Sequence, residues 1–262
     1  MKIIVCIKQV LDTAAKIRIQ GEKIVSSGSP LIINPYDEFA LEEAIRIKDA
    51  LPDSEITVYS MGSESAKEAL KRALAMGADR AIHILETSEE LDHLQVAKTL
   101  SKAISRERFD LVLCGRQAVD VDMAQVGPAL AVYLEIPFIT VVTKIQFDEY
   151  FKTVDITRQI EGGREIRKSM SLPFLATCQK GLNEPRLPSL KGIMAAKKKE
   201  IQSLTALGLD MDPNILDPKN IKLQTIKLSL PPERKKGIIL NGSDEEIAKQ
   251  LVTIIREEEK II

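Results

Sequence analysis

The segment from Gly115 to Gly127 has the composition of a phosphate-binding turn. It follows an apolar run that predicts a strand, and it leads into an apolar pattern typical of a helix. Gly115 permits a tight turn, and the backbone amides from about Met123 to Val126 are expected to face an anion, helped by the positive end of the helix dipole. Strand, loop and helix together predict a place for a nucleotide phosphate.

The polar side chains of this loop limit what it can bind. Gln117 and Gln125 can donate through their amides, whereas Asp120 and Asp122 would repel a phosphate that they faced. The two carboxylates are therefore expected to cap backbone amides or to accept a hydrogen bond from a ribose hydroxyl. Neither GxGxxG nor GxxxxGK[ST] occurs in the chain, so an ordinary turn between a strand and a helix is the alternative.

A second segment, residues 181–199, combines a proline-stiffened loop, an apolar residue and a basic end. Its two prolines lack amide donors, so we expect an extended path on the surface. Leu190 is then a candidate exposed contact, and the residues from Ile193 favour a short helix that ends near Lys197–Lys199. The segment predicts a surface for another protein, and a loop with solvated lysines is the alternative.

Strands alternate with amphipathic helices through residue 142. Strands are predicted at 2–8, 56–61, 80–85 and 109–114, and helices after Asn34-Pro35, after a capping box at Ser65 and Glu68, and from Leu94. This order predicts an α/β fold, a Rossmann-like parallel sheet with helices on both faces. Ligands of such sheets bind beyond the carboxyl ends of the strands.

The pattern changes after about residue 145. Residues 146–159 and 166–178 alternate like antiparallel strands joined by a turn at Gly162-Gly163. Residues 200–240 show little helical period and contain several prolines, which predicts an extended arm. Ser243 and Glu246 then predict the capped start of a terminal helix.

This change of pattern suggests two parts. Residues 1–199 form an α/β nucleotide-binding domain that includes the β extension and the loop. Residues 200–262 form an arm and a terminal helix that are expected to contact another subunit.

Composition excludes several classes of function. The net charge of -1, from 37 Lys and Arg against 38 Asp and Glu, argues against nucleic acid, and 4% aromatic content without Trp argues against a stacking platform. Cys6, Cys114 and Cys178 lack ligand spacing and only two histidines occur, so no metal is expected. No apolar run approaches the roughly 20 residues of a membrane span, and no signal segment is evident, so we expect a cytoplasmic protein.

Several motifs occur in an order known from one family. They are Val5–Val10, Asn34–Glu38 with Glu42–Ala44, Ala73–Arg80, Gly115–Ala118, and the stretch from Asn183–Arg186 through Leu190 and Ile193-Met194 to Lys197–Lys199. In these motifs the chain resembles the β subunit of electron-transferring flavoproteins. The resemblance covers most of the chain, and together the motifs are highly specific.

The resemblance implies a fold, a partner and cofactors. The fold is the adenine nucleotide alpha hydrolase-like form of the α/β class, and the protein is an electron-carrier subunit without catalytic residues rather than an enzyme. Its implied partner is an α subunit that holds most of the FAD, while this chain binds AMP. The loop around Leu190 would dock acyl-CoA dehydrogenases or other flavin dehydrogenases.

The resemblance also assigns residues. The implied nucleotide contacts are Cys6, Asn34, Pro35, Tyr36, Asp37, Met61, Gly115, Arg116, Gln117, Ala118, Val119, Asp120, Val121, Asp122, Met123, Ala124, Gln125 and Val126. Arg158 would lie near the flavin of the α subunit, and a salt bridge on a strand surface is its alternative role. The implied partner-binding residues are Asn183, Glu184, Pro185, Arg186, Leu190, Ile193 and Met194.

Departures from the family pattern leave alternatives open. Val121 and Met123 stand where electron-bifurcating members usually have Gly and Thr, which weakens the case for a second FAD. Gln159, by contrast, resembles the residue of bifurcating relatives. In that alternative, this chain binds a redox-active FAD and NADH is the electron donor. Ala195 replaces a frequent lysine. A free-standing nucleotide-binding sensor is a further alternative, but it gives the loop and the arm no purpose.

Overall fold

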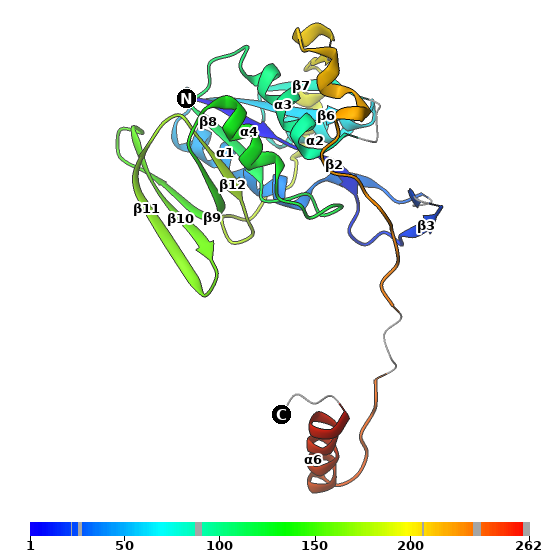
Figure 1. The fold of residues 1–262 in the computed structure, drawn as a ribbon. Helices are drawn as coiled ribbons and strands as arrows, with labels where there is room; N and C mark the ends of the chain where they lie inside the picture. The colour runs from blue at the N-terminus through cyan, green and yellow to red at the C-terminus, as the bar shows by residue number, and fades with distance from the viewer. Residues whose placement is uncertain (22, 26–27, 87–90, 206, 233–236, 259–262) are drawn as a thin grey trace.

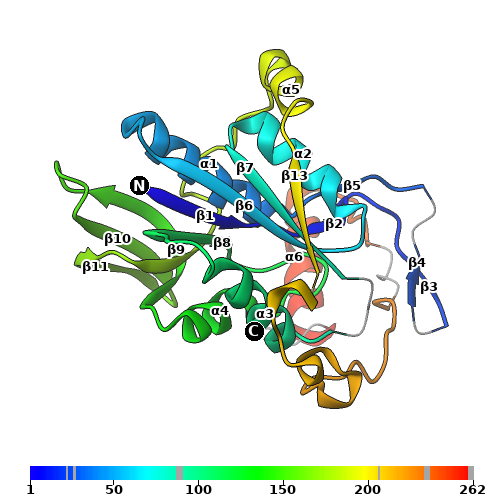
Figure 2. The same ribbon diagram turned by 90° about the horizontal axis from the view of Figure 1, so that it is seen from above.

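The computed structural model describes the chain from Met1 to Ile262 except residues 22, 26–27, 87–90, 206, 233–236 and 259–262 (Figure 1). In the described part, one sheet contains β1 (Lys2–Cys6), β6 (Glu55–Gly62), β7 (Arg80–Leu85), β8 (Leu111–Gly115), β9 (Phe138–Phe147), β10 (Thr153–Ile160), β11 (Gly163–Ser171), β12 (Phe174–Cys178) and β13 (Ile201–Thr205). Its strand order is β11-β10-β9-β12-β8-β1-β6-β7-β13 (Figure 2). Two small sheets pair β2 (Gln9–Leu11) with β5 (Leu31–Ile33) and β3 (Arg18–Gln20) with β4 (Lys23–Val25).

The centre of the large sheet is parallel. β1 lies between β6 and β8, and its last residue, Cys6, is in register with Tyr59 and Cys114. Along β1, Ile3 and Val5 belong to one buried cluster and Ile4 and Cys6 to another, because successive side chains of a strand point to opposite faces. Both faces are apolar, as expected for a parallel sheet that is covered on both sides.

Helices cover both faces. The cluster around Ile3 and Val5 includes α1 (Pro35–Ala50) and α2 (Ala66–Met76), and the cluster around Ile4 and Cys6 includes α3 (His93–Ile104) and α4 (Val126–Leu134). The predicted Rossmann-like α/β fold is confirmed. None of the described helices is long and apolar enough to cross a bilayer.

The prediction for residues 166–178 as one antiparallel strand is wrong. The segment divides into β11, which pairs antiparallel with β10 across the expected Gly162-Gly163 turn, and β12, which lies parallel between β8 and β9. Every residue of β12 is buried. An apolar strand buried on both faces belongs inside a parallel sheet, which explains the difference.

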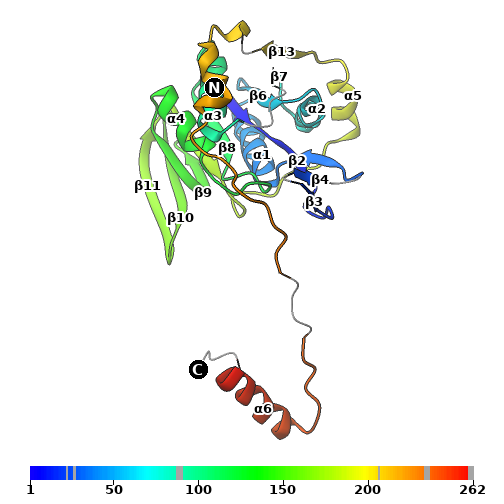
Figure 3. The same ribbon diagram turned by 45° about the vertical axis from the view of Figure 1, so that its right-hand side comes forward.

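The expected arm at 200–240 begins with a strand. β13 pairs parallel with β7 and forms an edge of the sheet. Short 3-10 turns follow at Leu207–Leu209, Pro213–Leu216 and Pro218–Asn220. The described residues on either side of 233–236 then run extended, away from the sheet, and the chain ends in α6 (Asp244–Thr253) and a π-helical turn at Ile254–Glu258 (Figures 1 and 3). Residues 233–236 of this arm lie outside the described part.

The two predicted capping boxes have different outcomes. At α6 the capping box is present, and the Glu246 carboxylate accepts from the Ser243 amide at 2.8 Å. At α2 the Ser65 side chain makes no cap, and its hydroxyl donates instead to Gln9 in β2 at 2.8 Å. Ser65 has helical backbone angles rather than the extended angles of an ordinary N-cap, which explains why its hydroxyl faces elsewhere.

Candidate functional site

The candidate nucleotide site lies where the sheet changes direction. From β1 the chain builds one side of the sheet through β6 and β7, and then returns through α3 to place β8 on the other side of β1. The segments that leave β1 and β8 therefore diverge at their carboxyl ends. Parallel α/β sheets bind ligands in the crevice at such a switch point, so this crevice is where we expect a nucleotide.

Asp37 bridges the two diverging segments. Its Oδ2 accepts from the Lys8 amide after β1 at 2.7 Å, and its Oδ1 accepts from the Gly115 amide at the end of β8 at 3.0 Å. The side chain is buried, and desolvation raises its pKa to about 7 despite these hydrogen bonds. A carboxyl group thus holds the base of the loop together from the first turn of α1.

Asn34 holds the next part of the loop. The sequence predicts this residue as the N-cap of α1, and its position is confirmed, but its side chain caps no helical amide. Its Nδ2 donates to the Gln117 carbonyl at 2.8 Å and its Oδ1 accepts from the Val119 amide at 3.1 Å. Asn34 is 1% exposed, so these bonds form away from water and fix the backbone of residues 117–119.

Polar and charged side chains in and beside the loop form hydrogen bonds with one another. Lys8 Nζ donates to Asp120 Oδ2 at 2.7 Å, and Gln117 Nε2 donates to Asp122 Oδ1 at 2.7 Å. Both aspartates therefore have side-chain partners within the protein. Of the two roles expected from the sequence, capping of a backbone amide is not seen in the described part of the chain, and acceptance from a ribose hydroxyl stays a prediction. Gln117 is committed to Asp122 in this arrangement.

The last part of the loop, residues 122–126, is distinguished by its backbone conformation rather than by its side chains. Asp122 and Ala124 have positive φ of 51° and 53°, an uncommon conformation that turns the chain toward α4. Among the residues that the structure describes, none accepts a hydrogen bond from the amides of residues 123–126. The side chains of Val121 and Met123 in this part of the loop are exposed.

Gly115 is required by close packing. A Cβ at this position would lie 2.2 Å from Asp37 Oδ1 and 2.7 Å from the carbonyl carbon of Tyr36. The close approach lets α1 reach the loop. Gly127 is similar, since its Cβ would lie 2.6 Å from the Thr177 methyl group in β12.

The remaining nucleotide contacts expected from the sequence lie around this crevice. Cys6 ends β1, Cys114 lies opposite it near the end of β8, and Met61 near the end of β6 packs against the same cluster. A hydrogen bond with Cys6, together with burial, raises the pKa of the Cys114 thiol, so the Cys114 side chain is a neutral packing group. Pro35 and Tyr36 are half-buried in the first turn of α1.

Arg158 lies beside this site rather than in it. Its Nη2 donates to Thr140 at 3.0 Å, its Nη1 is 3.8 Å from Glu165, and its buried Nε has no partner among the described residues. A hydrogen-bonded chain connects the neighbouring residue to the loop: Arg116 donates to Gln179 at 2.7 Å, and Gln179 donates to Gln159 at 2.5 Å. The sequence analysis missed Gln179, which has no motif of its own.

The segment at 181–199 forms a separate surface. α5 (Leu190–Ala196) packs against α2, and the Ser189 side chain caps it by accepting from Gly192 at 3.0 Å. Leu190 is 78% exposed, as predicted, and Ile193, Met194 and Glu184 are also exposed. The sequence analysis missed Leu187, which is 80% exposed in the extended stretch before α5. The residues that the resemblance implies for partner binding therefore lie over α1 and α2, away from the expected nucleotide site.

Comparisons with known proteins agree on one family. The family model of the electron transfer flavoprotein domain matches residues 22–207. The chain is 42% identical to the electron transfer flavoprotein subunit beta of Bacillus subtilis (strain 168), with 100% of both chains covered. It is 43% identical to the subunit beta of Thermoanaerobacterium thermosaccharolyticum over 96% of each chain, and 36% identical to that of Bos taurus over 95% of this chain and 96% of the bovine protein.

These relatives match the chain over nearly its whole length, and the shares of their own chains that are covered are equally high. This chain therefore belongs to the electron transfer flavoprotein family and is one of its beta subunits, an electron carrier.

Proposed function

We propose that this subunit binds AMP in the crevice between β1 and β8, within a heterodimer whose α subunit holds the electron-transferring FAD. The observation that carries the proposal is the fixed loop: buried Asn34 and Asp37 hold residues 115–119, and the amides of residues 123–126 have no partner in the described part of the chain. Backbone amides at a helix N-terminus bind phosphate without a basic side chain. Pro35 and Tyr36, with Cys6 and Met61, supply the surrounding wall.

A second FAD in place of AMP is the competing proposal, and it would make this an electron-bifurcating protein with NADH as donor. Val121 and Met123 support AMP, because both are exposed apolar residues where bifurcating members have small or hydroxyl-bearing ones. The test is co-expression with the α subunit under anaerobic conditions, followed by release and identification of the nucleotides. AMP with one FAD supports the proposal, and two FAD without AMP contradict it.

The heterodimer is supported by the arm and α6. No residue of α6 is buried, and Leu251 and Val252 are exposed on it. Ile226, Ile238 and Ile239 are exposed along the arm. Apolar surface of this extent is typical of an obligate interface. Size-exclusion chromatography tests this: a stable monomer that does not bind the α subunit would contradict it.

We further propose that Arg158 borders the flavin of the α subunit. Its support is a guanidinium near the end of β10, the second strand from the sheet edge, whose buried Nε has no partner among the described residues. The Arg158→Lys heterodimer should keep its FAD but show a changed flavin spectrum. An unchanged spectrum would place Arg158 outside the flavin environment.

The exposed loop is the proposed docking surface for acyl-CoA dehydrogenases or other flavin dehydrogenases. Leu187 and Leu190 project from a stretch stiffened by Pro185 and Pro188, which lowers the entropy lost on docking. Truncating an apolar anchor typically costs about 2 kcal/mol or more. Leu190→Ala should therefore slow electron transfer at subsaturating dehydrogenase without changing FAD content. A wild-type rate would contradict the docking assignment.

A further inference from the structure

Two adjacent carboxylates are buried in the middle of α1. Glu42 is 4% exposed and Glu43 is 5% exposed. Carboxylates are almost never buried to this degree unless they are paired. They belong to a motif that the sequence analysis singled out, yet they are not part of the nucleotide crevice. Their partners therefore indicate their role.

The partner of Glu42 is Arg186 in the docking loop. Arg186 Nε lies 3.1 Å from Oε1 and 2.9 Å from Oε2 of Glu42, and Arg186 Nη2 lies 2.9 Å from Oε1. The backbone amide of Arg186 also donates to Oε2, at 3.0 Å. Nη2 donates to Asp49 as well, at 2.9 Å. One buried carboxylate thus binds both the side chain and the backbone of the same loop residue.

Glu43 holds the start of the loop through Asn183. Asn183 Nδ2 donates to Glu43 Oε2 at 2.9 Å and to the Phe39 carbonyl at 3.0 Å. Both ends of the Asn183–Arg186 stretch are therefore attached to α1, one by an amide and the other by a guanidinium.

The far end of the loop is attached to α2. A Cβ on Gly192 would lie 2.1 Å from the Ala75 carbonyl oxygen, so only glycine lets α5 pack this closely. Lys199 Nζ donates to the Ala78 carbonyl at 2.7 Å. Between the two attachments lie Leu187 and Leu190, the two most exposed apolar residues of the segment.

We infer that Glu42 and Arg186 are positioning residues that hold the docking loop in its binding conformation before the dehydrogenase arrives. This inference rests on the proposed docking function of the loop. A guanidinium and a carboxylate in bidentate contact fix orientation as well as distance, which a lysine could not do. The partner then binds a surface that is already ordered, so little chain entropy is lost on docking.

The test uses the Arg186→Met heterodimer and an acyl-CoA dehydrogenase as electron donor. Freeing the loop should raise the KM for the dehydrogenase about tenfold, because one or two additional side chains must then be immobilised on docking. The kcat should stay near the wild-type value. Amide hydrogen exchange at residues 186–195 should become faster in the heterodimer without dehydrogenase. An unchanged KM would overturn the inference.

A double variant separates positioning from stability. Arg186→Met leaves the Glu42 carboxylate buried and unpaired, which destabilises the fold, and adding Glu42→Gln removes that charge. The double variant should regain stability but keep the raised KM. If the KM returns to the wild-type value together with stability, the pair is only structural and the inference fails.

Two further variants complete the test, one that perturbs the loop from the α2 side and one that serves as a control. Gly192→Ala perturbs the loop from the α2 side and should also raise the KM, although it leaves the Glu42–Arg186 contact in place. Glu68→Gln is the matched control, because it removes an ion pair with Lys71 that lies exposed on α2, and it should leave the KM unchanged. If Leu190→Ala slows transfer while Arg186→Met and Gly192→Ala do not, docking stands and the positioning role is wrong. If Leu190→Ala has no effect either, the docking function itself fails.

Discussion

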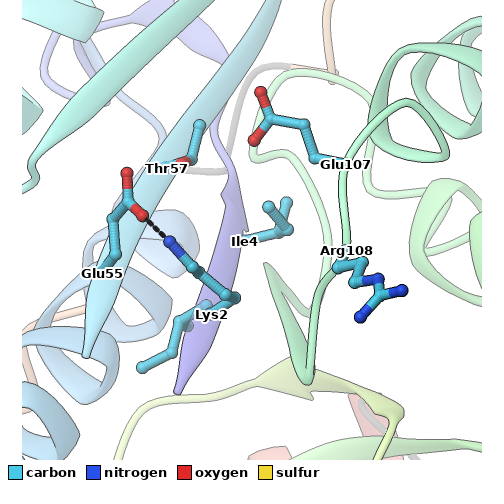
Figure 4. A pocket seen from close by; sticks show the side chains of 7 residues that line it. Lys2, Ile4, Glu55, Thr57, Glu107 and Arg108 are labelled. Atoms are coloured by element: carbon cyan, nitrogen blue, oxygen red, sulfur yellow. Dashed lines mark hydrogen bonds and ion pairs between the residues drawn. The ribbon is translucent and has the colours of Figure 1, made fainter. Parts of the chain in front are cut away.

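At the carboxyl end of the parallel strands, buried Asn34 and Asp37 bind backbone groups of a loop. At the amino end, charged side chains bind one another. There Lys2 pairs with Glu55, and Arg80 pairs with Glu107 through two contacts of 2.7 and 2.6 Å. A cavity of about 170 Å³ lies at this amino end, lined by Lys2, Ile3, Ile4, Glu55, Thr57, Glu107 and Arg108 (Figure 4).

The comparison places the cavity and the proposed nucleotide site at opposite ends of the sheet. Around the cavity, Lys2 and Glu55 point toward each other and are half-exposed, so their charges are satisfied without a ligand (Figure 4). At the other end, the polar side chains hold the loop, and the amides of residues 123–126 have no partner in the part of the chain that the structure describes. The proposed nucleotide site is therefore argued from a fixed backbone with unpaired donors and not from an enclosed volume.

The two ends also respond to pH in opposite directions. Desolvation raises the pKa of Asp37 to about 7, whereas a hydrogen bond from Arg80 lowers the pKa of Glu107. A raised carboxyl pKa gives stability that is present in acid and lost as the pH rises toward 7. A lowered one gives stability that is present above the usual pKa of Glu and lost as the pH falls below it.

The largest expected effect is at Asp37. Between about pH 5 and pH 8, wild type should lose on the order of 3 kcal/mol of unfolding free energy relative to Asp37→Asn, because only the wild-type group must ionise while buried. Thermal unfolding of both heterodimers across this range measures the difference. A difference that is independent of pH would show that Asp37 is already ionised at pH 5.

A substitution at Gly115 should have the next largest effect. Gly115→Val places carbon atoms against Asp37 and the backbone of Tyr36, which should cost about 2 kcal/mol and release the bound nucleotide. Met123→Ala removes only an exposed side chain and should keep the nucleotide. Nucleotide content after gel filtration decides: loss from the Met123 variant, with Gly115→Val unaffected, would mean that side chains rather than backbone bind the phosphate.

A smaller effect is expected at Glu107. Glu107→Gln should cost about 1 kcal/mol at neutral pH, because its bidentate pair with Arg80 is partly exposed to solvent. The cost should shrink as the pH falls through the lowered pKa of Glu107, the reverse of the behaviour of Asp37. Unfolding curves at acidic and neutral pH test this. A cost that grows in acid would contradict the contrast between the two ends.

The smallest effect is expected at Lys2. Lys2→Met breaks an exposed ion pair with Glu55 and should change stability by less than about 1 kcal/mol. Nucleotide content should be unchanged. A nucleotide loss here as large as at Gly115 would assign a ligand to the cavity and remove the distinction between the two ends.

Much of the fold could be predicted from local pattern. β7 occupies residues 80–85 as expected, Gly77 ends α2 with a φ of 143°, and the capping box at Ser243 begins α6. These features depend on neighbouring residues, whose spacing and backbone preferences are visible in the sequence. The parallel pairing of β12 and β13 was not predicted, because the sequence of a short apolar strand does not indicate which strand it pairs with, or whether the pairing is parallel or antiparallel.

The sequence by itself determined the family, the alternation of strands and helices, and which loops carry the candidate nucleotide and docking residues, since motifs and periodicity are local properties of the chain. Only the tertiary structure decided how those residues act. Asn34 and Asp37 hold a loop about 80 positions away, and Glu42 holds Arg186 from the middle of a helix. Such pairings arise because the βα crossovers bring segments that are distant in sequence next to one another, where burial makes each hydrogen bond specific.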